Sequence, residues 1–330
     1  MRSLQRELCA SAALLFALQI STNAQSGNSV PAQKSQPVPN HESTRSDKFT
    51  GGRIEKTTLA EGQADVEITV NVPAFRLTLW QNGKEVKTYP VGVGQKDYPI
   101  VIGEREATEV IWNPPWIPPD SEWVHEMSGV KPGEVIKASD PRNPLGKLKI
   151  PLGGGYLIHQ AKGVGDLGNL VSHGCVRMLR SDLFDLAENI AAAYAWPVSK
   201  KQIGRARSGN RALTAKLDEP LTVDINYDTE VIEGGVLYLY PDVYGRGTNT
   251  IERLREELRG GGVDTAKLSE RTLNRMLARP SRTEAFVVSV ASIEAGRALL
   301  DGRMRPLVRR AAARKPAAKK RPAPRQTSGL

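Results

Sequence analysis

Apolar residues recur at every second position over residues 66–79, and this alternation limits the fold more than any other feature of the sequence. The apolar positions are 66, 68, 70 and 72, followed by 75, 77 and 79. A period of two is that of a half-buried β-strand and does not suit an amphipathic helix. Asn82-Gly83 then favours a hairpin turn, since both residues tolerate positive φ, and residues 86–93 predict the returning strand. The sequence predicts a β-meander in a mostly β domain that begins near residue 64.

Further strands and one helix are predicted downstream. Strands are expected at 148–152 and 156–159, and a helix capped by Ser181 and ended by Pro197 should cover one side of the sheet. Residues 92–144 are expected to be irregular, because the stretch 113–119 is rich in proline, which lacks an amide donor. Trp112 and Trp116 in this segment either line a groove or anchor the loop, and we favour anchoring.

The part of the chain after residue 200 predicts an accessory α/β region, which we place at 201–302. A strand at 221–227 is expected to pair with one at 236–240, and short amphipathic helices are expected at 250–259 and 268–278. The main domain is therefore placed at 64–200. The pattern of this accessory region indicates no chemistry.

The first 63 residues are typical of targeting and linker sequence. Arg2 and Arg6 give a basic start, residues 10–20 are apolar, and small residues at Thr22 and Ala24 suit a cleavage site. We predict a signal peptide over 1–24, with an uncleaved membrane anchor as the alternative. Residues 25–63, rich in Ser, Pro, Gln and Asn, predict a disordered linker. The mature protein is expected to be soluble and exported.

The C-terminus carries the whole excess of positive charge. The chain has a formal net charge of +10, and ten Lys or Arg residues but no acid follow Asp301. A segment of Ala, Pro, Lys and Arg cannot bury a core, so residues 303–330 are predicted to be a disordered basic tail. In an exported protein, anionic envelope polymers or lipid head groups suit this tail better than nucleic acid does. The alternative is a solvated tail without a specific partner.

Export makes the cysteine count informative. The chain has two cysteines, Cys9 inside the predicted signal and Cys175. Cleavage of the signal leaves Cys175 without a partner in its chain, and a lone thiol in an oxidising compartment indicates a reactive residue or an intermolecular bridge. A buried inert cysteine is the competing interpretation, and the surrounding sequence argues against it.

Cys175 lies in a short segment that gathers groups suited to acyl transfer. His173 and Gly174 precede it, and His159 lies 13 residues before Ser172. A free thiol is only a few per cent thiolate at neutral pH, and a nearby imidazole can take its proton and return it to a leaving amine. Gly174 allows a backbone amide to approach a developing oxyanion, and the Cys175 amide is the natural second donor.

Two other residue types in this segment bear on the chemistry. Arg177 can hold a carboxylate in a bidentate fork. His159, His173 and Cys175 could instead be three zinc ligands, but no Cys-x-x-Cys or His-Glu-x-x-His spacing accompanies them. We therefore predict no metal and no cofactor, and the sequence has no nucleotide-binding loop.

Tyr156-Leu-Ile-His159 followed by Val171-Ser-His-Gly-Cys-Val-Arg-Met178 resembles the catalytic motif of the L,D-transpeptidase (YkuD-type) family. The resemblance covers roughly residues 64–200 and suggests a Gram-negative exported member. It implies an L,D-transpeptidase-like β-sandwich with one covering helix. His159 is followed by Gln160, where the family usually has glycine, so Gln160 either narrows the cleft or hydrogen-bonds substrate.

The resemblance also implies a reaction. Cys175 would attack the L-centre carbonyl of diaminopimelate in a peptidoglycan tetrapeptide stem and expel D-Ala, with His159 as general base and Gly174 in the oxyanion site. His173 would shape the catalytic site, while Ser172, Arg177 and Gln160 would contact substrate. The acyl group would pass to a second stem peptide or an envelope protein in the periplasm, and no nucleic acid is involved.

Three alternatives remain open from the sequence. Water could replace the amine acceptor, which would make the protein an L,D-carboxypeptidase. A sortase-like enzyme also uses Cys, His and Arg, but the Ser-His-Gly-Cys context fits it poorly. The basic tail and the linker would also suit a peptidoglycan-binding protein without catalysis, in which Cys175 would be inert toward alkylation.

Overall fold

The structure is a computed structural model that describes residues 65–194 and 198–308. The predicted signal peptide, the predicted linker and most of the basic tail therefore lie outside the described residues. No helix among the residues described is long and apolar enough to cross a bilayer.

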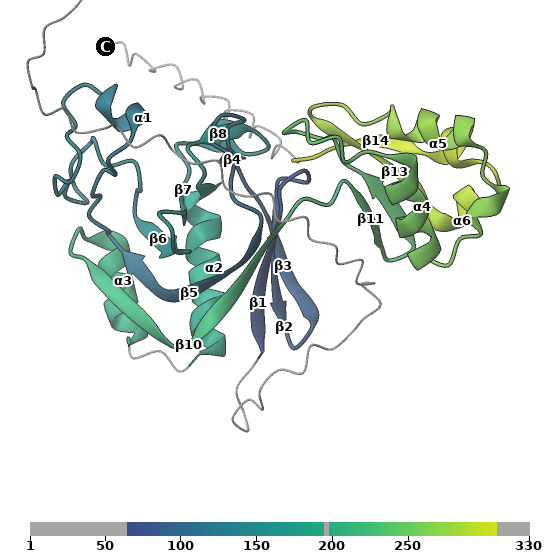
Figure 1. Cartoon of the computed structure of the whole chain (residues 1–330). Helices are drawn as coiled ribbons and strands as arrows, with labels where there is room; N and C mark the ends of the chain where they lie inside the picture. The colour runs from purple at the N-terminus through teal and green to yellow at the C-terminus, as the bar shows by residue number, and fades with distance from the viewer. Residues whose placement is uncertain (1–64, 195–197, 309–330) are drawn as a thin grey trace, which may run out of the picture. The chain divides into compact units, whose positions relative to one another are not determined.

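The N-terminal part of the described chain is built on one mixed sheet of eight strands (Figure 1). Its order is β3-β2-β1-β10-β5-β6-β7-β9, and a separate pair joins β4 to β8. The strands are β1 (Val66–Asn71), β2 (Arg76–Gln81), β3 (Lys84–Pro90), β4 (Val93–Gly94), β5 (Gly103–Trp112), β6 (Leu148–Pro151), β7 (Leu157–Gln160), β8 (Leu170–Ser172), β9 (Val176–Met178) and β10 (Leu213–Asn226).

The predicted meander is confirmed. β1 pairs antiparallel with β2, and β2 with β3, in the register that turns the alternating apolar residues inward. Asn82 and Gly83 have φ values of 52° and 70°, as the hairpin turn requires. Ile68, Val70 and Leu77 are completely buried, so the period of two does mark the core face of these strands.

The prediction that residues 92–144 are irregular is wrong for the ten residues of β5. This strand pairs with β10 on one side and β6 on the other. Its outer face carries charged side chains, and only Ala107, Val110 and Trp112 are buried, so its alternation is hard to recognise in the sequence. Trp112 and Trp116 are 1% and 5% exposed, which agrees with the anchoring role.

Two long helices cover the sheet where one was expected. α2 (Arg180–Ala193) contacts β6 and β7, and α3 (Lys200–Ser208) contacts β5 and β10. Ser181 was predicted as the cap of the first helix, but α2 begins one residue earlier and Leu179 occupies the cap position without a side-chain bond. One hydrophobic cluster joins both helices to residues of every strand in the large sheet.

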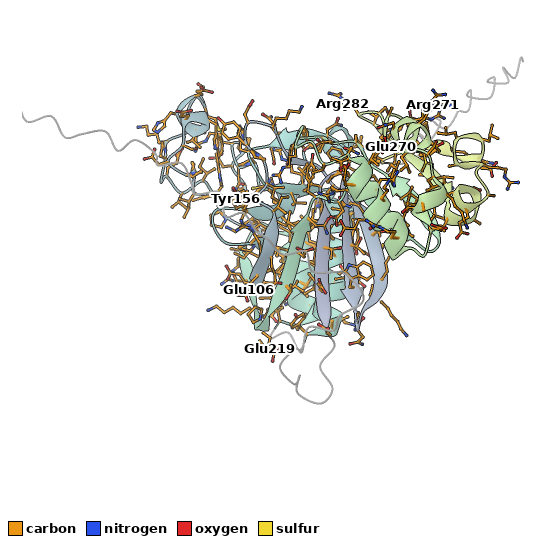
Figure 2. All side chains as sticks on the ribbon, turned by 45° about the vertical axis from the view of Figure 1, so that its right-hand side comes forward. Glu106, Tyr156, Glu219, Glu270, Arg271 and Arg282 are labelled. Carbon is orange, nitrogen blue, oxygen red and sulfur yellow. The ribbon has the colours of Figure 1, made fainter. Side chains whose placement is uncertain are left out.

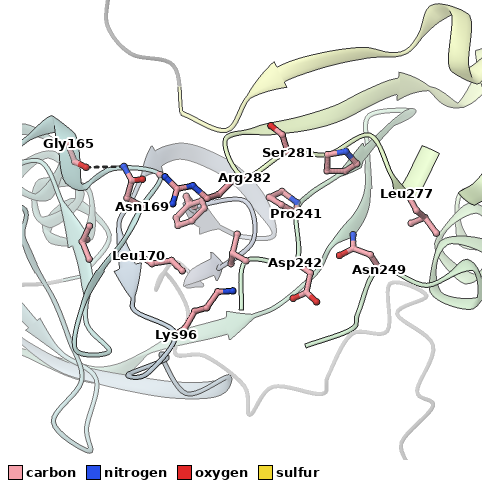
Figure 3. Close-up of a pocket in the computed structure, with 15 residues that line it drawn as sticks. Lys96, Gly165, Asn169, Leu170, Pro241, Asp242, Asn249, Leu277, Ser281 and Arg282 are labelled. Carbon is pink, nitrogen blue, oxygen red and sulfur yellow. Dashed lines mark hydrogen bonds between the residues drawn. The ribbon is translucent and has the colours of Figure 1, made fainter. Parts of the chain in front are cut away.

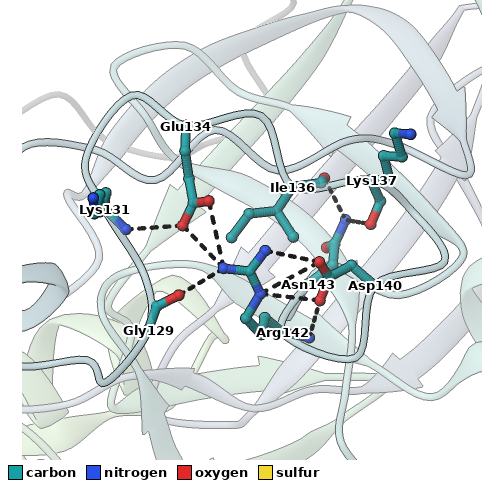
Figure 4. A network of polar contacts seen from close by, with 8 residues as sticks. All are labelled: Gly129, Lys131, Glu134, Ile136, Lys137, Asp140, Arg142 and Asn143. Carbon is teal, nitrogen blue, oxygen red and sulfur yellow. Dashed lines mark hydrogen bonds and ion pairs between the residues drawn. The ribbon is translucent and has the colours of Figure 1, made fainter.

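Residues 113–147 form an ordered loop that includes the short helix α1 (Glu122–His125). Its own small core consists of Trp116, Val124, Val130, Ile136 and Leu145. Arg142 donates to the Gly129 carbonyl, Glu134 and Asp140, as Figure 4 shows, and the Asn143 amide binds the carbonyls of Pro114 and Ile136. These contacts hold in place a proline-rich segment that has little regular structure.

The C-terminal region has its own sheet, in the order β11-β12-β13-β14, and its own core. Its elements are β11 (Glu230–Glu233), β12 (Val236–Leu239), α4 (Ile251–Gly260), α5 (Glu270–Leu277), β13 (Glu284–Ser289), α6 (Val290–Glu294), α7 (Ala298–Asp301) and β14 (Arg303–Pro306). The predicted helices at 250–259 and 268–278 correspond to α4 and α5. Residues 303–306 pair with β13, so the basic tail does not begin at 303.

The strand at 221–227 does not belong to the accessory region. It is part of β10, which lies between β1 and β5 in the centre of the large sheet, and residues 236–239 pair with β11 and β13 instead. The predicted domain boundary at residue 200 is corrected accordingly, because the sheet that begins at Val66 is completed only at Asn226.

The position of β10 predicts the outcome of truncation. A chain that ends at residue 210 loses the strand between β1 and β5, and we expect it to show no cooperative unfolding by circular dichroism in urea. A chain that ends at residue 308 keeps every described element and should unfold cooperatively. A sharp transition in the shorter chain would show that β10 is dispensable.

Candidate active site

Parallel pairing of β7 with β9 brings together the two residues predicted to carry the chemistry. The register opposes Ile158 to Val176 and His159 to Arg177. Residues that oppose each other in a sheet share a face, so the His159 and Arg177 side chains lie side by side. Cys175 immediately precedes β9, level with Leu157 on the neighbouring strand and two residues from His159. The sequence predicts that His159 and Cys175 lie close together, and the pairing of β7 with β9 places their segments side by side.

The turn at residues 172–175, which contains the predicted nucleophile and is called the nucleophile loop below, depends on Gly174. This residue has a φ of 104°, which side-chain-bearing residues rarely adopt. A Cβ built on Gly174 would lie 2.7 Å from Cε1 of Tyr156, so the Tyr156 ring also leaves no room for a side chain. The Gly174 and Cys175 amides are not among the backbone donors that bind other described residues, which leaves both N–H groups available to an oxyanion.

Cys175 is only partly exposed, so its thiol is largely buried but still accessible to solvent. Burial raises the pKa of Cys175, and a hydrogen bond from the backbone of Leu157 and the charge of Arg177 offset part of that rise. The net direction is upward. At neutral pH the resting residue is therefore a thiol rather than a thiolate.

His159 is 4% exposed and is held in its neutral form. Burial lowers the pKa of its imidazole to about 3, and the Arg177 charge acts in the same direction, while the Gln160 backbone and Asp166 oppose them. Its Nδ1 atom is buried and makes no hydrogen bond within the part of the chain described here. A neutral imidazole with an unused nitrogen is the state that a general base requires.

Arg177 is paired with a carboxylate of its own chain. Its Nη1 lies 3.2 Å from Oδ2 of Asp166, and the two side chains are 11% and 13% exposed. The same Oδ2 atom accepts the backbone N–H of Lys162 at 2.9 Å. The guanidinium predicted to hold a substrate carboxylate is thus already engaged, and Asp166, in the 3₁₀ turn Val164–Asp166, is a residue that the sequence did not single out.

Ser172 and Gln160, both predicted to contact substrate, hold the site together. The Ser172 hydroxyl donates to the Cys175 carbonyl at 2.6 Å, and the Ser172 residue is 1% exposed. Oε1 of Gln160 accepts the Lys147 backbone N–H at 3.0 Å, and a Cβ on Gly146 would lie 2.6 Å from the Gln160 side chain. Gln160 therefore fixes the loop before β6 instead of projecting freely into a cleft.

His173 is exposed and lies between two aromatic rings from other segments. Its ring stacks on Trp123 at 4.3 Å between centroids, and Tyr98 meets it edge-on at 4.7 Å. Burial and the Arg177 charge lower the pKa of His173. This stacking attaches the ordered loop of residues 113–147 to the nucleophile loop, and neither aromatic partner was predicted from sequence.

A third anchor comes from the C-terminal side of β10. The Tyr244 hydroxyl donates to the Gly94 carbonyl at 3.1 Å and lies 3.4 Å from the Ile100 amide, which donates to it. Gly94 has no room for a side chain, because a Cβ there would lie 3.0 Å from Cα of Gly174. Tyr244 thus fixes the segment that packs behind the nucleophile loop.

Within the described residues, no group of three or more His, Cys, Asp or Glu side chains is arranged to hold a metal ion. His159, His173 and Cys175 therefore do not form the zinc-like cluster weighed from the sequence. The arrangement offers a thiol, a neutral imidazole and two free amides, which together suit acyl transfer.

Comparison with known proteins agrees with this chemistry. Residues 65–210 match the family profile of the L,D-transpeptidase catalytic domain, YkuD. This part of the chain contains all the residues of the site described above except Tyr244. This part of the chain is therefore similar to an L,D-transpeptidase catalytic domain.

The relatives are of moderate similarity. The chain is 26% identical over 172 residues to the probable L,D-transpeptidase YcfS of Escherichia coli K12, covering 50% of this chain and 53% of that protein. It is 29% identical over 126 residues to the probable L,D-transpeptidase YbiS of the same strain, covering 37% and 41%. The chain thus spans about half the length, or less, of the curated relatives it matches.

Solved structures give a weaker match. An L,D-transpeptidase from Mycobacterium smegmatis aligns with 15% identity and a TM-score of 0.30, over 49% of this chain and 59% of that one. L,D-transpeptidase 3 from Mycobacterium tuberculosis aligns with 15% identity and a TM-score of 0.31, over 49% and 61%.

The Asp166–Arg177 pair predicts a double-mutant cycle. Asp166→Asn leaves a buried guanidinium without its counter-charge, and we expect it to lower the free energy of unfolding by about 3 kcal/mol. Adding Arg177→Met removes the stranded charge and should restore most of that loss. Urea denaturation of the four proteins measures the coupling, and additive losses would contradict the pairing.

The same pair predicts a change in thiol reactivity. In Asp166→Asn the Arg177 charge acts on Cys175 without compensation, so the pKa of the thiol should fall and alkylation by iodoacetamide at pH 7 should be faster. Lys162→Ala is the control, because Asp166 accepts the backbone N–H of Lys162 and needs nothing from its side chain. An unchanged rate in a folded Asp166→Asn protein would show that the pair does not influence Cys175.

Proposed function

We propose that this protein is a cysteine-dependent L,D-transpeptidase that acts on the tetrapeptide stems of peptidoglycan. The observation that carries the proposal is the adjacency of a buried neutral imidazole at His159 and a partly accessible thiol at Cys175, set by the pairing of β7 and β9. The motif and the family match support the same reaction class.

The course of acylation is set by the protonation states of Cys175 and His159. Because both groups are neutral at rest, proton transfer from the thiol to His159 accompanies attack of the sulfur on the L-centre carbonyl of diaminopimelate. The oxyanion is received by the amides of Gly174 and Cys175. Collapse breaks the bond to D-Ala, whose nitrogen takes the proton from His159, and leaves a thioester on Cys175.

Deacylation reverses these roles. An acceptor amine attacks the thioester carbonyl, the carbon–sulfur bond breaks, and the amine proton returns through His159 to the sulfur. A second stem peptide as acceptor gives a cross-link, and an envelope protein with an accessible amine gives an anchored protein. Water as acceptor would give an L,D-carboxypeptidase product from the same thioester.

The proposed location is the periplasm. It is supported by the basic and apolar start of the sequence, with small residues near position 24, which is typical of a signal peptide. The basic segment after residue 308 is proposed to contact anionic envelope polymers through its lysines and arginines.

Product analysis tests the proposal. Incubated with a disaccharide-tetrapeptide, the wild-type chain should release D-Ala and form a dimer linked through two diaminopimelate residues, separable by chromatography and mass spectrometry. Cys175→Ala should reduce the rate by at least about a thousandfold, since no other group can form the thioester. Cys9→Ala, which removes the other cysteine of the chain, should match wild type.

The products distinguish transpeptidase, carboxypeptidase and non-catalytic alternatives. Release of D-Ala with a tripeptide and no dimer identifies water as the acceptor and supports the carboxypeptidase alternative. Turnover that persists in Cys175→Ala would reject the proposed nucleophile. Absence of any reaction by a folded wild-type chain, with or without an added envelope protein, would favour a binding protein without catalysis.

The neutral resting pair predicts a distinctive pH dependence of thiol alkylation. Because burial raises the pKa of Cys175 and lowers that of His159, no thiolate–imidazolium pair forms near neutrality. The iodoacetamide rate should rise tenfold per pH unit across pH 6–8 without a plateau, as for a thiol that titrates alone. A plateau that begins near pH 5 would mean an ion pair and would contradict the assignment.

A further inference from the structure

A pocket of about 820 Å³ lies beside the nucleophile loop and is not part of the catalytic arrangement. Its lining comes from β8 and the turn before it, from Lys96, and from the C-terminal region (Figure 3). Figure 3 draws Lys96, Asn169 and Leu170 on one side of the view and Asn249 and Leu277 on the other. The volume falls in the range of about 300–1,000 Å³ that is usual for small-molecule sites.

The pocket presents two positive charges without partners. Neither Lys96 nor Arg282 makes a hydrogen bond or an ion pair with any residue of the described chain. Arg76 and Arg177, by contrast, are paired with Glu233 and Asp166. Two unpaired cations in one concave surface attract an anionic ligand.

The carboxylate in the lining, Asp242, pairs with neither of these cations. Asp242 accepts the Tyr227 hydroxyl at 2.6 Å and the backbone N–H groups of Arg246 and Gly247 at 2.9 and 2.6 Å. Burial alone would raise the pKa of Asp242, but these hydrogen bonds lower it overall. Its oxygens are occupied by the turn after β12, which leaves Lys96 and Arg282 to the ligand.

The remaining lining suits a short peptide. Phe75, Leu170 and Leu277 provide apolar contact for aliphatic side chains, and Ser281 and the two asparagines provide polar groups. The Asn169 amide nitrogen already donates to the Gly165 and Leu167 carbonyls, and that of Asn249 to the Tyr240 carbonyl. Their side-chain oxygens are left to accept from ligand N–H groups.

We propose that this pocket binds a second, non-reacting stem peptide of peptidoglycan through its carboxylates. The inference rests on the proposed function for the identity of the ligand, while the pocket itself rests on the geometry alone. Such peptides combine free carboxylates, amide N–H groups and short aliphatic side chains, which correspond to the three kinds of lining. Lys96 and Arg282 hold the carboxylates in this assignment.

The position of the pocket next to the Cys175 segment suggests what a bound stem peptide would do. β8 leads from Leu170 into Ser172, and the Gln95 amide, next to Lys96, donates to the Ser172 carbonyl at 2.9 Å. The pocket and the nucleophile loop thus share two segments of backbone. Glycan strands carry many stems, so occupation of the pocket by one stem raises the effective concentration of a neighbouring stem at Cys175.

Direct binding tests the proposal without requiring turnover. Soluble glycan strands with tetrapeptide stems, fluorescently labelled, are titrated against the full chain carrying Cys175→Ala, and anisotropy gives the affinity. Adding Lys96→Ala and Arg282→Ala should weaken binding about tenfold, since two cations are lost from the contact. The weakening should disappear with strands whose stem carboxylates are amidated.

Two surface cations outside the pocket provide the matched control. Lys201, in α3, and Arg271, in α5, are both exposed, and Figure 2 labels Arg271 and Arg282 in the same region of the chain. The Lys201→Ala and Arg271→Ala pair loses the same net charge and should change the affinity less than twofold. Equal weakening in both pairs would mean a general charge effect and would overturn the site.

Kinetics separate this inference from the proposed function. If the wild-type chain reacts, the pocket variant should raise KM for polymeric strands about tenfold and leave the acylation rate with an isolated disaccharide-tetrapeptide within twofold. If no chain reacts, the proposed function fails, and the binding comparison still decides the pocket. Binding by the pocket variant equal to that of the parent chain would reject the inference in either case.

Discussion

The parallel pairing of β7 with β9 is the constraint on which the site depends. It opposes His159 to Arg177 and leaves Cys175 directly before the neighbouring strand, so three candidate site residues acquire fixed positions from two short segments of backbone. The surroundings hold this pairing in place: Ser172 binds the carbonyl of Cys175, Gly92 bridges to Arg177 by backbone hydrogen bonds, and α2 packs against β7. A shift of one residue in this register would turn the side chains of one strand to the opposite face and separate His159 from Arg177.

Burial then decides the electrostatics of the site. A low-dielectric position disfavours charge on both partners, which raises the pKa of Cys175 and lowers that of His159. Arg177 lowers both pKa values, and Asp166 limits its effect on His159. Both groups are therefore neutral at rest, and in the proposed reaction the thiol loses its proton only as it attacks. A thiol that is protonated at rest is also less prone to oxidation than a thiolate.

Much of this architecture could be predicted from residue patterns, and the exceptions have physical causes. The meander, α4, α5 and the Cys–His arrangement follow from local signals. β5 was missed because its charged outer face hides three buried positions, and α3 because only Ile203 and Ala206 of its nine residues are buried, although Ser199 and Gln202 form a capping box. Asp166, Tyr244 and Trp123 act on the site through contacts between distant segments, which no local pattern records. Gln160 and Ser172 were predicted to contact substrate, and in the structure Oε1 of Gln160 and the Ser172 hydroxyl bind backbone groups.

The central claim is that Cys175 carries the acyl group, and trapping that group tests it most directly. The wild-type chain is mixed briefly with a disaccharide-tetrapeptide, quenched in acid, digested and mapped by mass spectrometry. The account predicts a hydroxylamine-sensitive adduct, equal in mass to the donor less D-Ala, on the peptide that contains Cys175. An adduct on any other residue, or D-Ala release and product formation with Cys175 unmodified throughout the turnover, would contradict it.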